Sequence, residues 1–405
     1  MAILGKILRW AIRIFRSVIG VDEKKLYGLD HSILHMEVPP TSMWMNMGYW
    51  KHTNSFPDAC EALLDQVLIT ADLLSESRTP GAPSTLTVSS STRSSRFEAR
   101  HELQRENKIK LVDVGIGCGD QALYLTRRLS RPACHSHTGL SFTDTECAPG
   151  ESEDMERPRL VESGSLPLFD SYVGITIAQS QADVARERLL KRNPSGNGSP
   201  EWTPEIRIFA ADAARPALWG QELRDIVVDD KNRGPQITNK HRTGYAETCG
   251  SKKEKWQTWL LALDTLYHFE PSRKPLLRCA YRDMRASFMA FDLIISDRAT
   301  FWEKLILRSI CLVTGIPYSN FLSRKEYENM LVEAGYDCNM IVMRDITEYV
   351  FKGIAGYIWS KDRELRRYGM HVGKFRGPAK VFDWWADSGA VRGFVIVARW
   401  SENQK

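Results

Sequence analysis

The sequence predicts an α/β protein with a doubly wound sheet of seven mostly parallel strands and helices on both faces. Three observations predict this class. Short apolar runs alternate with segments of helical pattern, as in βαβ units. The runs are continuously apolar, as in strands buried on both faces of a parallel sheet. The first run ends in a glycine-rich turn, which in this class joins a strand to a helix.

Seven apolar runs are expected to be strands. They cover residues 110–115, 171–176, 205–210, 259–263, 287–296, 336–343 and 392–400. Helices are expected at 120–129, 179–190, 271–284 and 326–334. Proline opens the third helix and Gly335 follows the fourth, as is common at helix ends. No clear helix separates the last two strands, so the last strand is expected to run antiparallel.

The charge of the chain argues against a nucleic-acid partner. The formal net charge is +5 over 405 residues. Four cations, Lys6, Arg9, Arg13 and Arg16, lie in segment 1–21, which holds no acid. The rest is near neutral, whereas proteins that wrap a nucleic-acid backbone usually carry a larger basic excess. No uncharged apolar run approaches the roughly 18 residues of a membrane-spanning helix.

Four polar stretches are expected to be insertions in a single domain that spans residues 21–405. They cover residues 78–107, 132–170, 192–204 and 221–256 and are rich in Ser, Gly, Pro and charged residues. Such stretches bury too little apolar area to offset the entropy of ordering them. The residues outside them suit one large domain.

The eight cysteines indicate free thiols rather than a disulfide framework. They include no CxxC pair, and in a chain of this length they indicate a reducing compartment. Cys134, His135, His137 and Cys147 lack the spacing of a zinc site. No metal is therefore expected.

Segment 1–20 predicts a basic amphipathic helix. On a helical wheel the four cations share one side, and apolar residues such as Ile7, Trp10 and Phe15 fill the other. Such a helix can lie in a membrane interface through residues 2–19, act as a mitochondrial transit peptide, or dock on the domain. An intracellular protein, cytoplasmic or membrane-associated, is expected, with a mitochondrial one as the alternative. The sequence gives no oligomeric state.

The strongest functional signal is the segment 111–121, which reads LVDVGIGCGDQ. A strand leads into Gly115, Gly117 and Gly119 and then into a helix. Glycine allows the tight turn and lets a ligand approach the backbone. The dinucleotide fingerprint would need glycine at position 120, where Asp120 stands. A nicotinamide enzyme is therefore disfavoured.

Three acids accompany this glycine turn. Asp113 lies on the first strand, Asp212 follows the third in AADA, and Asp264 closes the fourth in ALDTLYHF. Ligands of open parallel sheets bind beyond the carboxyl ends of the strands, so the acids and the turn are expected to converge on one edge. For each acid, a helix N-cap is the alternative role.

These segments resemble the class I S-adenosylmethionine-dependent methyltransferases, whose fold is Rossmann-like. VDVGIGCGDQ is similar to the family's first motif, and AADAARP to its adenine-side motif. GITIAQSQ and ALDTLYHF are most similar to the branch of cyclopropane fatty acid synthases and small-molecule methyltransferases. SMWMNMGYW resembles a segment of several small-molecule members. The likeness spans about residues 42–400 outside the insertions.

The resemblance implies S-adenosyl-L-methionine as the cofactor and a set of residues that would hold it. The three glycines would back its methionine and ribose parts. Asp113 would face its ammonium group. Asp212, with the backbone of Ala211 and Ala213, would bind the adenine.

The implied ribose contact departs from the family pattern. Many members carry an acid at the end of the second strand, where this chain has Thr176. A hydroxyl binds a ribose hydroxyl more weakly than a carboxylate does. Gln181 is expected to assist it.

The chemistry implied is methyl transfer, which needs an acceptor held near the methyl group, aligned and shielded from water. His268, one turn after Asp264, is the candidate general base, since histidine titrates near neutral pH. Tyr49, Trp50 and Tyr267 are candidates for aromatic walls on the substrate side. Core packing is the alternative role for each of these four side chains.

The acceptor is expected to be a small molecule. Asp264 and the three residues after it read DTLY, without the Pro-Pro motif of enzymes that methylate amino groups of nucleobases or glutamine. Together with the near-neutral core, this indicates a lipid, quinone, sterol or secondary metabolite. The alternative is a methyltransferase-fold binding protein that lacks catalysis.

Overall fold

The computed structural model describes residues 42–75, 108–132, 165–190, 204–228, 256–367 and 371–402. Its strands are β1 Lys108–Val114, β2 Ser130–Pro132, β3 Ser165–Pro167, β4 Ser171–Thr176, β5 Glu205–Ala210, β6 Trp256–Leu263, β7 Ala286–Ile295, β8 Ile341–Asp345 and β9 Val391–Ala398. Its helices are α3 Phe56–Thr70, α5 Asp120–Leu123, α6 Gln179–Leu190, α7 Gln221–Val227, α8 Lys274–Arg282, α9 Phe301–Thr314, α10 Arg324–Ala334, α11 Phe351–Arg366 and α12 Arg376–Ser388.

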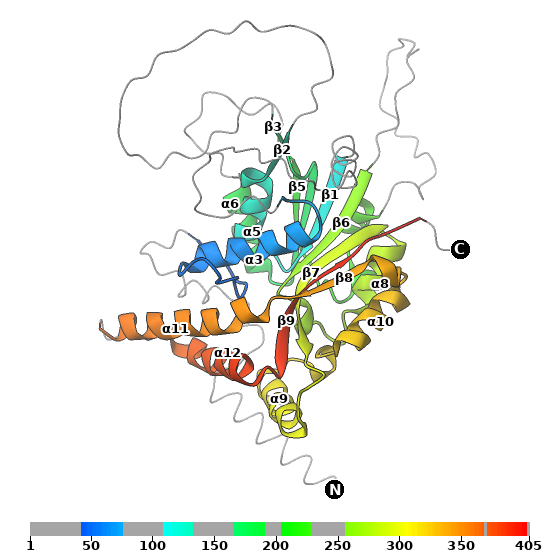
Figure 1. Ribbon diagram of the computed structural model, residues 1–405. Helices are drawn as coiled ribbons and strands as arrows, with labels where there is room; N and C mark the ends of the chain where they lie inside the picture. Colours follow the sequence, from blue (N-terminus) through cyan, green and yellow to red (C-terminus); the bar gives the residue numbers. More distant parts are fainter. Residues whose placement is uncertain are drawn as a thin grey trace, which may run out of the picture.

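Seven strands form one sheet in the order β5-β4-β1-β6-β7-β9-β8 (Figure 1). The first five of these run parallel to one another, and β9 runs antiparallel to both β7 and β8. The predicted class, a mostly parallel Rossmann-like sheet whose last strand is antiparallel, is confirmed. β2 and β3 form a separate antiparallel pair.

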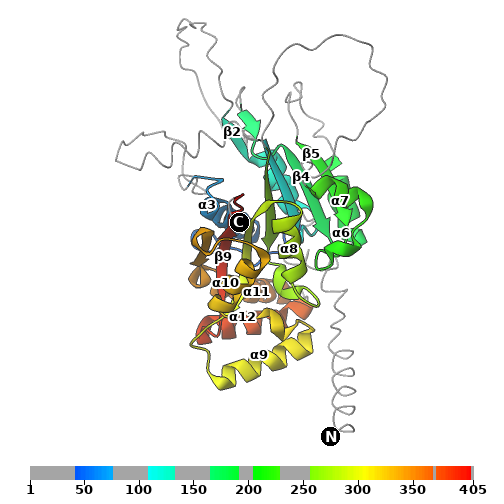
Figure 2. The same cartoon turned by 90° about the vertical axis from the view of Figure 1, so that its right-hand side faces the viewer.

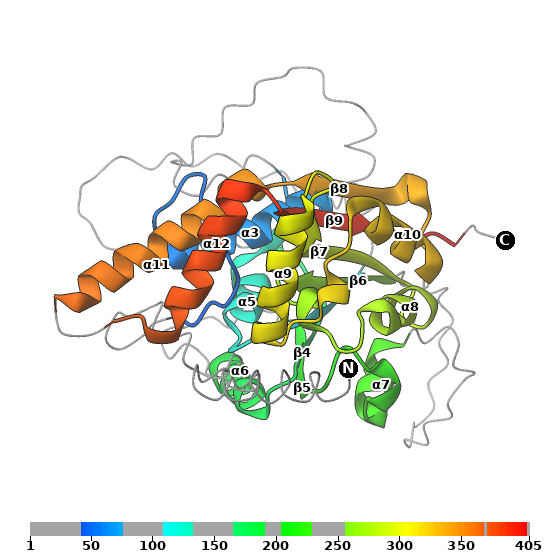
Figure 3. The same ribbon diagram turned by 90° about the horizontal axis from the view of Figure 1, so that it is seen from below.

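Helices cover both faces of the sheet, as Figure 3 shows from below. One apolar cluster joins the sheet to α3, α5, α6, α9, α11 and α12, and the other joins it to α7, α8 and α10. Successive strand residues point to opposite faces, so that Leu111 packs in the first cluster and Val112 in the second. All ten residues of β7 are buried, which explains why eight of them are apolar and why its Asp292 is paired with Arg273.

Several predicted boundaries were wrong. The predicted helix 120–129 is a short α5 that continues as a π-helix, Tyr124–Arg128. The predicted helix 271–284 begins at Lys274, and its opening proline is Pro275. The predicted strand 336–343 begins only at Ile341, because the chain first makes a 3-10 turn at Cys338–Met340.

Two of the predicted insertions contain regular structure. Helix α7 lies within residues 221–256 and buries Leu223 and Val227 against the sheet. Strand β3 lies within residues 132–170. The rest of the four stretches lies almost wholly outside the described residues. Segment 1–20 and the cysteines and histidines at 134–147 lie outside them too.

The largest departure from the prediction lies between the last two strands. The sequence suggested no helix there, whereas α11 and α12 stand between β8 and β9 and pack against each other (Figure 1). In the described part of the chain, no helix is both long and apolar enough to cross a membrane. Nor do the described His, Cys, Asp and Glu side chains form a cluster suited to a metal ion.

Candidate functional site

The glycine turn joins β1 to α5 at the carboxyl edge of the sheet. Gly115, Gly117 and Gly119 have φ values of 84°, 56° and 91°, in the left-handed region that favours glycine. A Cβ atom at these positions would lie 2.7 Å from Thr265 Oγ1, 2.5 Å from Met45 Sδ and 2.9 Å from Ala185 Cβ, respectively. The left-handed φ favours glycine at all three positions, and close packing against Thr265 and Ala185 adds to this at Gly115 and Gly119. The backbone of Gly115 is exposed.

The neighbouring strands fix the position of this turn. The N–H of Gly115 donates to Ile175 O at 2.8 Å, and the N–H of Ala211 donates to Thr176 O at 2.9 Å. The ends of β5, β4, β1 and β6 therefore lie in a row. This confirms that the carboxyl ends of β5, β4 and β6 share one edge of the sheet. Asp212 follows β5, Thr176 ends β4, and Asp264 follows β6.

Asp113 points into the protein beside the turn. Gln121 Nε2 donates to its two oxygens at 2.7 and 2.9 Å, and the Tyr172 hydroxyl donates to Oδ2 at 2.7 Å. The carboxyl group is fully buried, and burial raises its pKa to about 7, although the two hydrogen-bond donors lower it. Both oxygens are engaged by protein groups, so Asp113 ties α5 and β4 to β1.

The residues predicted to bind the ribose and the adenine lie at the ends of β4 and β5. The Thr176 hydroxyl donates to Gln181 Oε1 at 2.7 Å, which joins the two predicted ribose residues. Asp212 is half-buried, and its Oδ1 accepts the N–H of Ala214 at 2.9 Å. Ala211 and Ala213 flank it on the same turn. Arg215 Nε lies 3.5 Å from Asp212 Oδ2 in an exposed ion pair, and each carboxylate oxygen keeps a second lone pair that can accept from a ligand.

Residues 42–50, here called the strap, lie across the turn. The N–H of Met43 donates to Asp120 Oδ2 at 3.0 Å, and the N–H of Met47 donates to Asp264 Oδ2 at 2.8 Å. Between them, the Met45 sulfur lies over Gly117 and accepts from Gln181 Nε2 at 3.7 Å. The strap therefore forms a wall of the site, which sequence reasoning did not predict for Met45.

Asp120, which stands where the dinucleotide fingerprint has glycine, has a structural task. It is buried, and Arg188 of α6 donates to both its oxygens, with Nη2 at 2.8 Å from Oδ1. Since the strap also bonds to Asp120, this one carboxylate joins α5, α6 and the strap.

Asp264 is the least satisfied acid of the site. Its φ of 58° is in the left-handed region, which an Asp adopts at a steric cost. Its Oδ1 atom is buried and has no hydrogen-bond partner among the described residues. Burial raises the pKa of Asp264 to about 8, although Tyr267 and the Met47 N–H lower it. An orphaned buried oxygen of this kind indicates a place for a ligand's donor.

Tyr267 and His268 follow Asp264 in a 3-10 turn, Leu266–His268. Their rings lie 4.2 Å apart between centroids. Burial lowers the pKa of His268 to about 4, so the imidazole is neutral at pH 7 and a weak base. The structure thus brings Asp264, Tyr267 and His268 together beside the glycine turn, where Thr265 packs on Gly115.

A buried network braces this turn from below. Asn320 Nδ2 donates to Tyr267 O at 3.1 Å and to Phe269 O at 2.8 Å. Arg273 in turn donates to the carbonyl of Asn320 and forms an ion pair with the buried Asp292. The positions of Tyr267 and His268 therefore depend on α8, β7 and the segment after α9.

The other two predicted wall residues contact other aromatic rings. The ring of Tyr49 lies 5.1 Å from that of Tyr349. The ring of Trp50 lies 6.1 Å from that of Phe56 and 5.3 Å from that of Tyr357, and these two rings stack on each other. Trp50 thus packs the strap on α3 and α11, and Tyr49 packs it on the 3-10 turn Thr347–Tyr349.

The comparisons with known proteins give structural likeness only. No protein-family model and no curated protein matches the chain. It is similar to the [4+2]-cyclase SpnF, with 14% identity over 93% of this chain and 94% of that one and a TM-score of 0.45. It is also similar to the cyclopropane synthase MmaA2 from Mycobacterium tuberculosis, with 9% identity over 92% and 94% and a TM-score of 0.49.

A third structure is the mycolic acid cyclopropane synthase CmaA1 complexed with SAH and CTAB, with 10% identity over 92% and 94% of the two chains and a TM-score of 0.48. The matched structures thus include the branch that the motifs resemble. At these identities and TM-scores, the likenesses assign neither an activity nor an acceptor. The strand order and the site geometry carry the proposal that follows.

Proposed function

We propose that this protein is an S-adenosyl-L-methionine-dependent methyltransferase that acts on a small organic acceptor, such as a lipid, quinone, sterol or secondary metabolite. One observation carries the proposal. Along the sheet edge, Asp212, the Thr176–Gln181 pair, the exposed backbone of Gly115 and Asp264 stand in a row. Such a row suits an elongated ligand with a base, a ribose and an amino-acid portion.

The residues present fit this cofactor. Asp212 would accept a hydrogen bond from the adenine amino group, with the backbone of Ala211 and Ala213 beside it. Thr176 and Gln181 would bind the ribose. The turn around Gly115, Gly117 and Gly119 would hold the methionine portion. Asp113, with both oxygens engaged, would act through Gln121 rather than by direct contact.

When bound, the cofactor supplies a methyl group activated by a positive sulfur. The protein's task is then to position the acceptor. The Oδ1 atom of Asp264, which has no partner among the described residues, would accept a hydrogen bond from the N–H or O–H of the acceptor. The pKa of Asp264, about 8, lies near neutral pH, as suits a group that accepts a proton during the reaction. The pKa of His268, about 4, is too low for that role. His268 and Tyr267 would line the acceptor site.

Calorimetric titration with S-adenosylmethionine and S-adenosylhomocysteine tests the proposal. The Asp212→Ala variant should bind about 5- to 150-fold more weakly, since an unsatisfied donor costs about 1–3 kcal/mol. The matched control is Glu222→Ala, which removes an exposed acid of α7. Equal affinities in the three proteins, or no binding by the native chain, would contradict the proposed cofactor site.

Methyl release on small-molecule extracts then tests catalysis. The native chain should release methyl groups to an acceptor, and Asp264→Asn should lower the rate by more than its effect on cofactor affinity. Cofactor binding without any methyl release would favour the alternative, a binding protein of the same fold.

A further inference from the structure

Helix α9 carries large apolar side chains on two opposite sides. Leu307 and Cys311 are buried on the sheet side. On the opposite side, Phe301, Trp302, Leu305 and Ile306 are 70%, 69%, 42% and 46% exposed. Half of the strongly exposed large apolar side chains in the described residues belong to this one helix. A patch of this kind on a soluble domain marks an interaction surface.

The outward face of α9 lies at one end of the molecule (Figure 2). On a helical wheel at about 100° per residue, Lys304 and Arg308 border the apolar face on one side. Glu303 borders the other, and its carboxylate accepts the N–H and hydroxyl of Thr300 at 2.7 and 2.9 Å as a helix cap. The apolar face itself contains no ionisable side chain.

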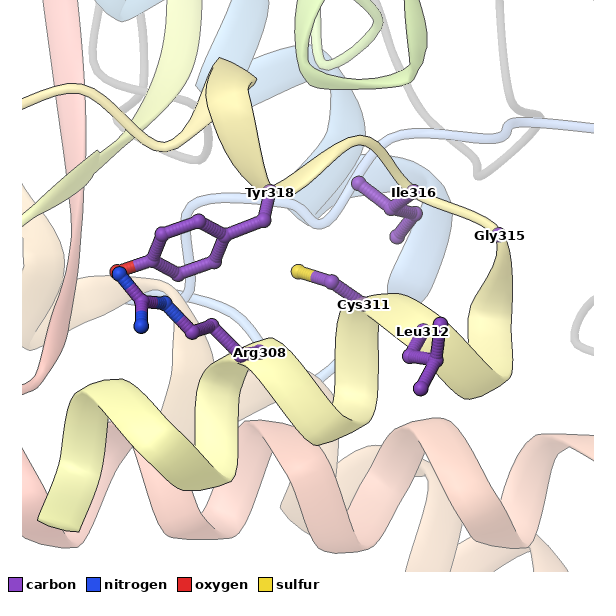
Figure 4. Close-up of a pocket in the computed structure, with 6 residues that line it drawn as sticks. All are labelled: Arg308, Cys311, Leu312, Gly315, Ile316 and Tyr318. Carbon is purple, nitrogen blue, oxygen red and sulfur yellow. The ribbon is translucent and has the colours of Figure 1, made fainter. Parts of the chain in front are cut away.

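A pocket adjoins the carboxyl end of this face (Figure 4). Its volume is about 260 Å³, and it is lined by Arg308, Cys311, Leu312, Gly315, Ile316 and Tyr318. Arg308 lies over the Tyr318 ring, 4.8 Å from its centroid, whereas Cys311 and Ile316 line the inner wall. An apolar pocket with a guanidinium at its side suits an acyl chain that carries a phosphate.

We propose that α9 docks this domain on the surface of an anionic lipid bilayer. Phe301, Trp302, Leu305 and Ile306 enter the boundary of the acyl chains, as the apolar face of an interfacial helix does. Lys304 and Arg308 meet the phosphates, with their aliphatic stems along the apolar face. This docking does not depend on the methyl-transfer proposal.

The charges beside the apolar face of α9 favour a lipid bilayer, rather than segment 1–20 of the same chain, as the partner that covers this face. That segment carries four cations and no acid, so it would bring like charge to Lys304 and Arg308. An anionic surface complements both. The sequence pattern of the segment is that of a second interfacial helix, and two such helices in one chain would bind one membrane more tightly than either alone.

Flotation of the full-length protein with vesicles of phosphatidylcholine, with and without phosphatidylserine, tests the proposal. The native chain should float with the anionic vesicles, and less at high salt. Trp302→Glu with Leu305→Glu should lower binding by at least about tenfold, because two large apolar side chains leave the bilayer. The matched control is Val332→Glu with Val342→Glu, at exposed positions on α10 and β8, which should float as the native chain does.

The double variant Ile7→Glu with Ile14→Glu measures the contribution of segment 1–20 in the same assay. Thermal melting shows whether each variant is folded, and Trp302→Gln is the milder substitute if the charged variant unfolds. Native-like flotation of a folded α9 variant would overturn the proposal, as would equal flotation of the native chain on neutral vesicles. A native dimer that becomes a monomer in the α9 variant, without any flotation, would show that a second copy is the occupant instead.

Discussion

The acids on the two sides of the glycine turn differ in how their oxygens are used. On the β1 side, Asp113 and Asp120 have every carboxylate oxygen engaged by Gln121, Tyr172, Arg188 or the strap. On the β6 side, Asp264 has one engaged oxygen and one buried oxygen without a partner among the described residues.

We propose that this difference separates structural from functional acids. A buried carboxylate oxygen that lacks a donor destabilises the folded protein, and Asp264 adds a backbone in the left-handed region. Such features persist where the surrounding structure imposes them, and they are concentrated at functional sites. We therefore expect that replacing a fully engaged acid, or its partner, lowers stability, and that replacing Asp264 lowers function.

The largest effect is expected for the ion pair beneath the β6 turn. Arg273→Met would leave the buried Asp292 with Tyr327 and backbone donors but without its cation. Removing one partner of such a pair costs about 3–5 kcal/mol of unfolding free energy. Urea unfolding measures it, with Lys274→Met as the control. Lys274 pairs with Glu333 on the surface at 3.0 Å, where such pairs contribute about 0–1 kcal/mol.

A smaller loss is expected on the β1 side. Asp113→Ala would leave the Gln121 amide and the Tyr172 hydroxyl without their acceptor, at about 1–3 kcal/mol. Asp113→Asn, which keeps one acceptor oxygen, should lose less in the same unfolding measurement. If both variants kept native stability but lost S-adenosylmethionine binding, Asp113 would be a ligand-contacting acid, and the comparison would fail.

The most specific effect, a change in how stability depends on pH, is expected for Asp264→Asn. A carboxyl group whose pKa is higher in the folded state holds its proton more tightly there. Stability therefore falls as pH rises from the unfolded value, about 4, to the folded value of about 8. The neutral amide of the variant removes this contribution.

The pH window for this test is about 6.5 to 8. Below about 6.5, His268 contributes with the opposite sign, because its lowered pKa makes stability rise with pH between about 4 and 6.5. Between about pH 6.5 and 8, the unfolding free energy of the native chain should fall with pH more steeply than that of Asp264→Asn. Parallel pH profiles would show that the Asp264 carboxyl is not protonated more readily in the folded protein.

The sequence predicts well where local patterns decide the structure. β4, α6 and β5 begin and end at the predicted residues, since polar or turn residues bound each of them. Helix α9 is not predicted, because its apolar residues form no single stripe. Its start is nevertheless encoded, since Thr300 and Glu303 form a capping box, a pattern that sequence reasoning can find.

Helix α11 could not be predicted from the local sequence pattern, because it depends on contacts with distant residues. It contains Gly353 and Gly356, which lower helix propensity. Gly353 is needed because the ring of Trp50, from the strap, occupies the place of a side chain there. The orphaned oxygen of Asp264 has a similar origin, because its φ and its bond to Met47 depend on tertiary packing. The motifs therefore indicate the site, but not which of its acids is left for a ligand.

One amide group relates the outer end of the molecule to its interior. Asn320 follows the pocket segment at Tyr318 and holds the carbonyls of Tyr267 and Phe269. Proposed binding at α9 and proposed binding beside Asp264 would therefore act on two backbone segments that the Asn320 side chain joins. Thermodynamic linkage requires reciprocity between two such sites. If a bound nucleoside changes the affinity for vesicles by some factor, then bound vesicles must change the affinity for that nucleoside by the same factor.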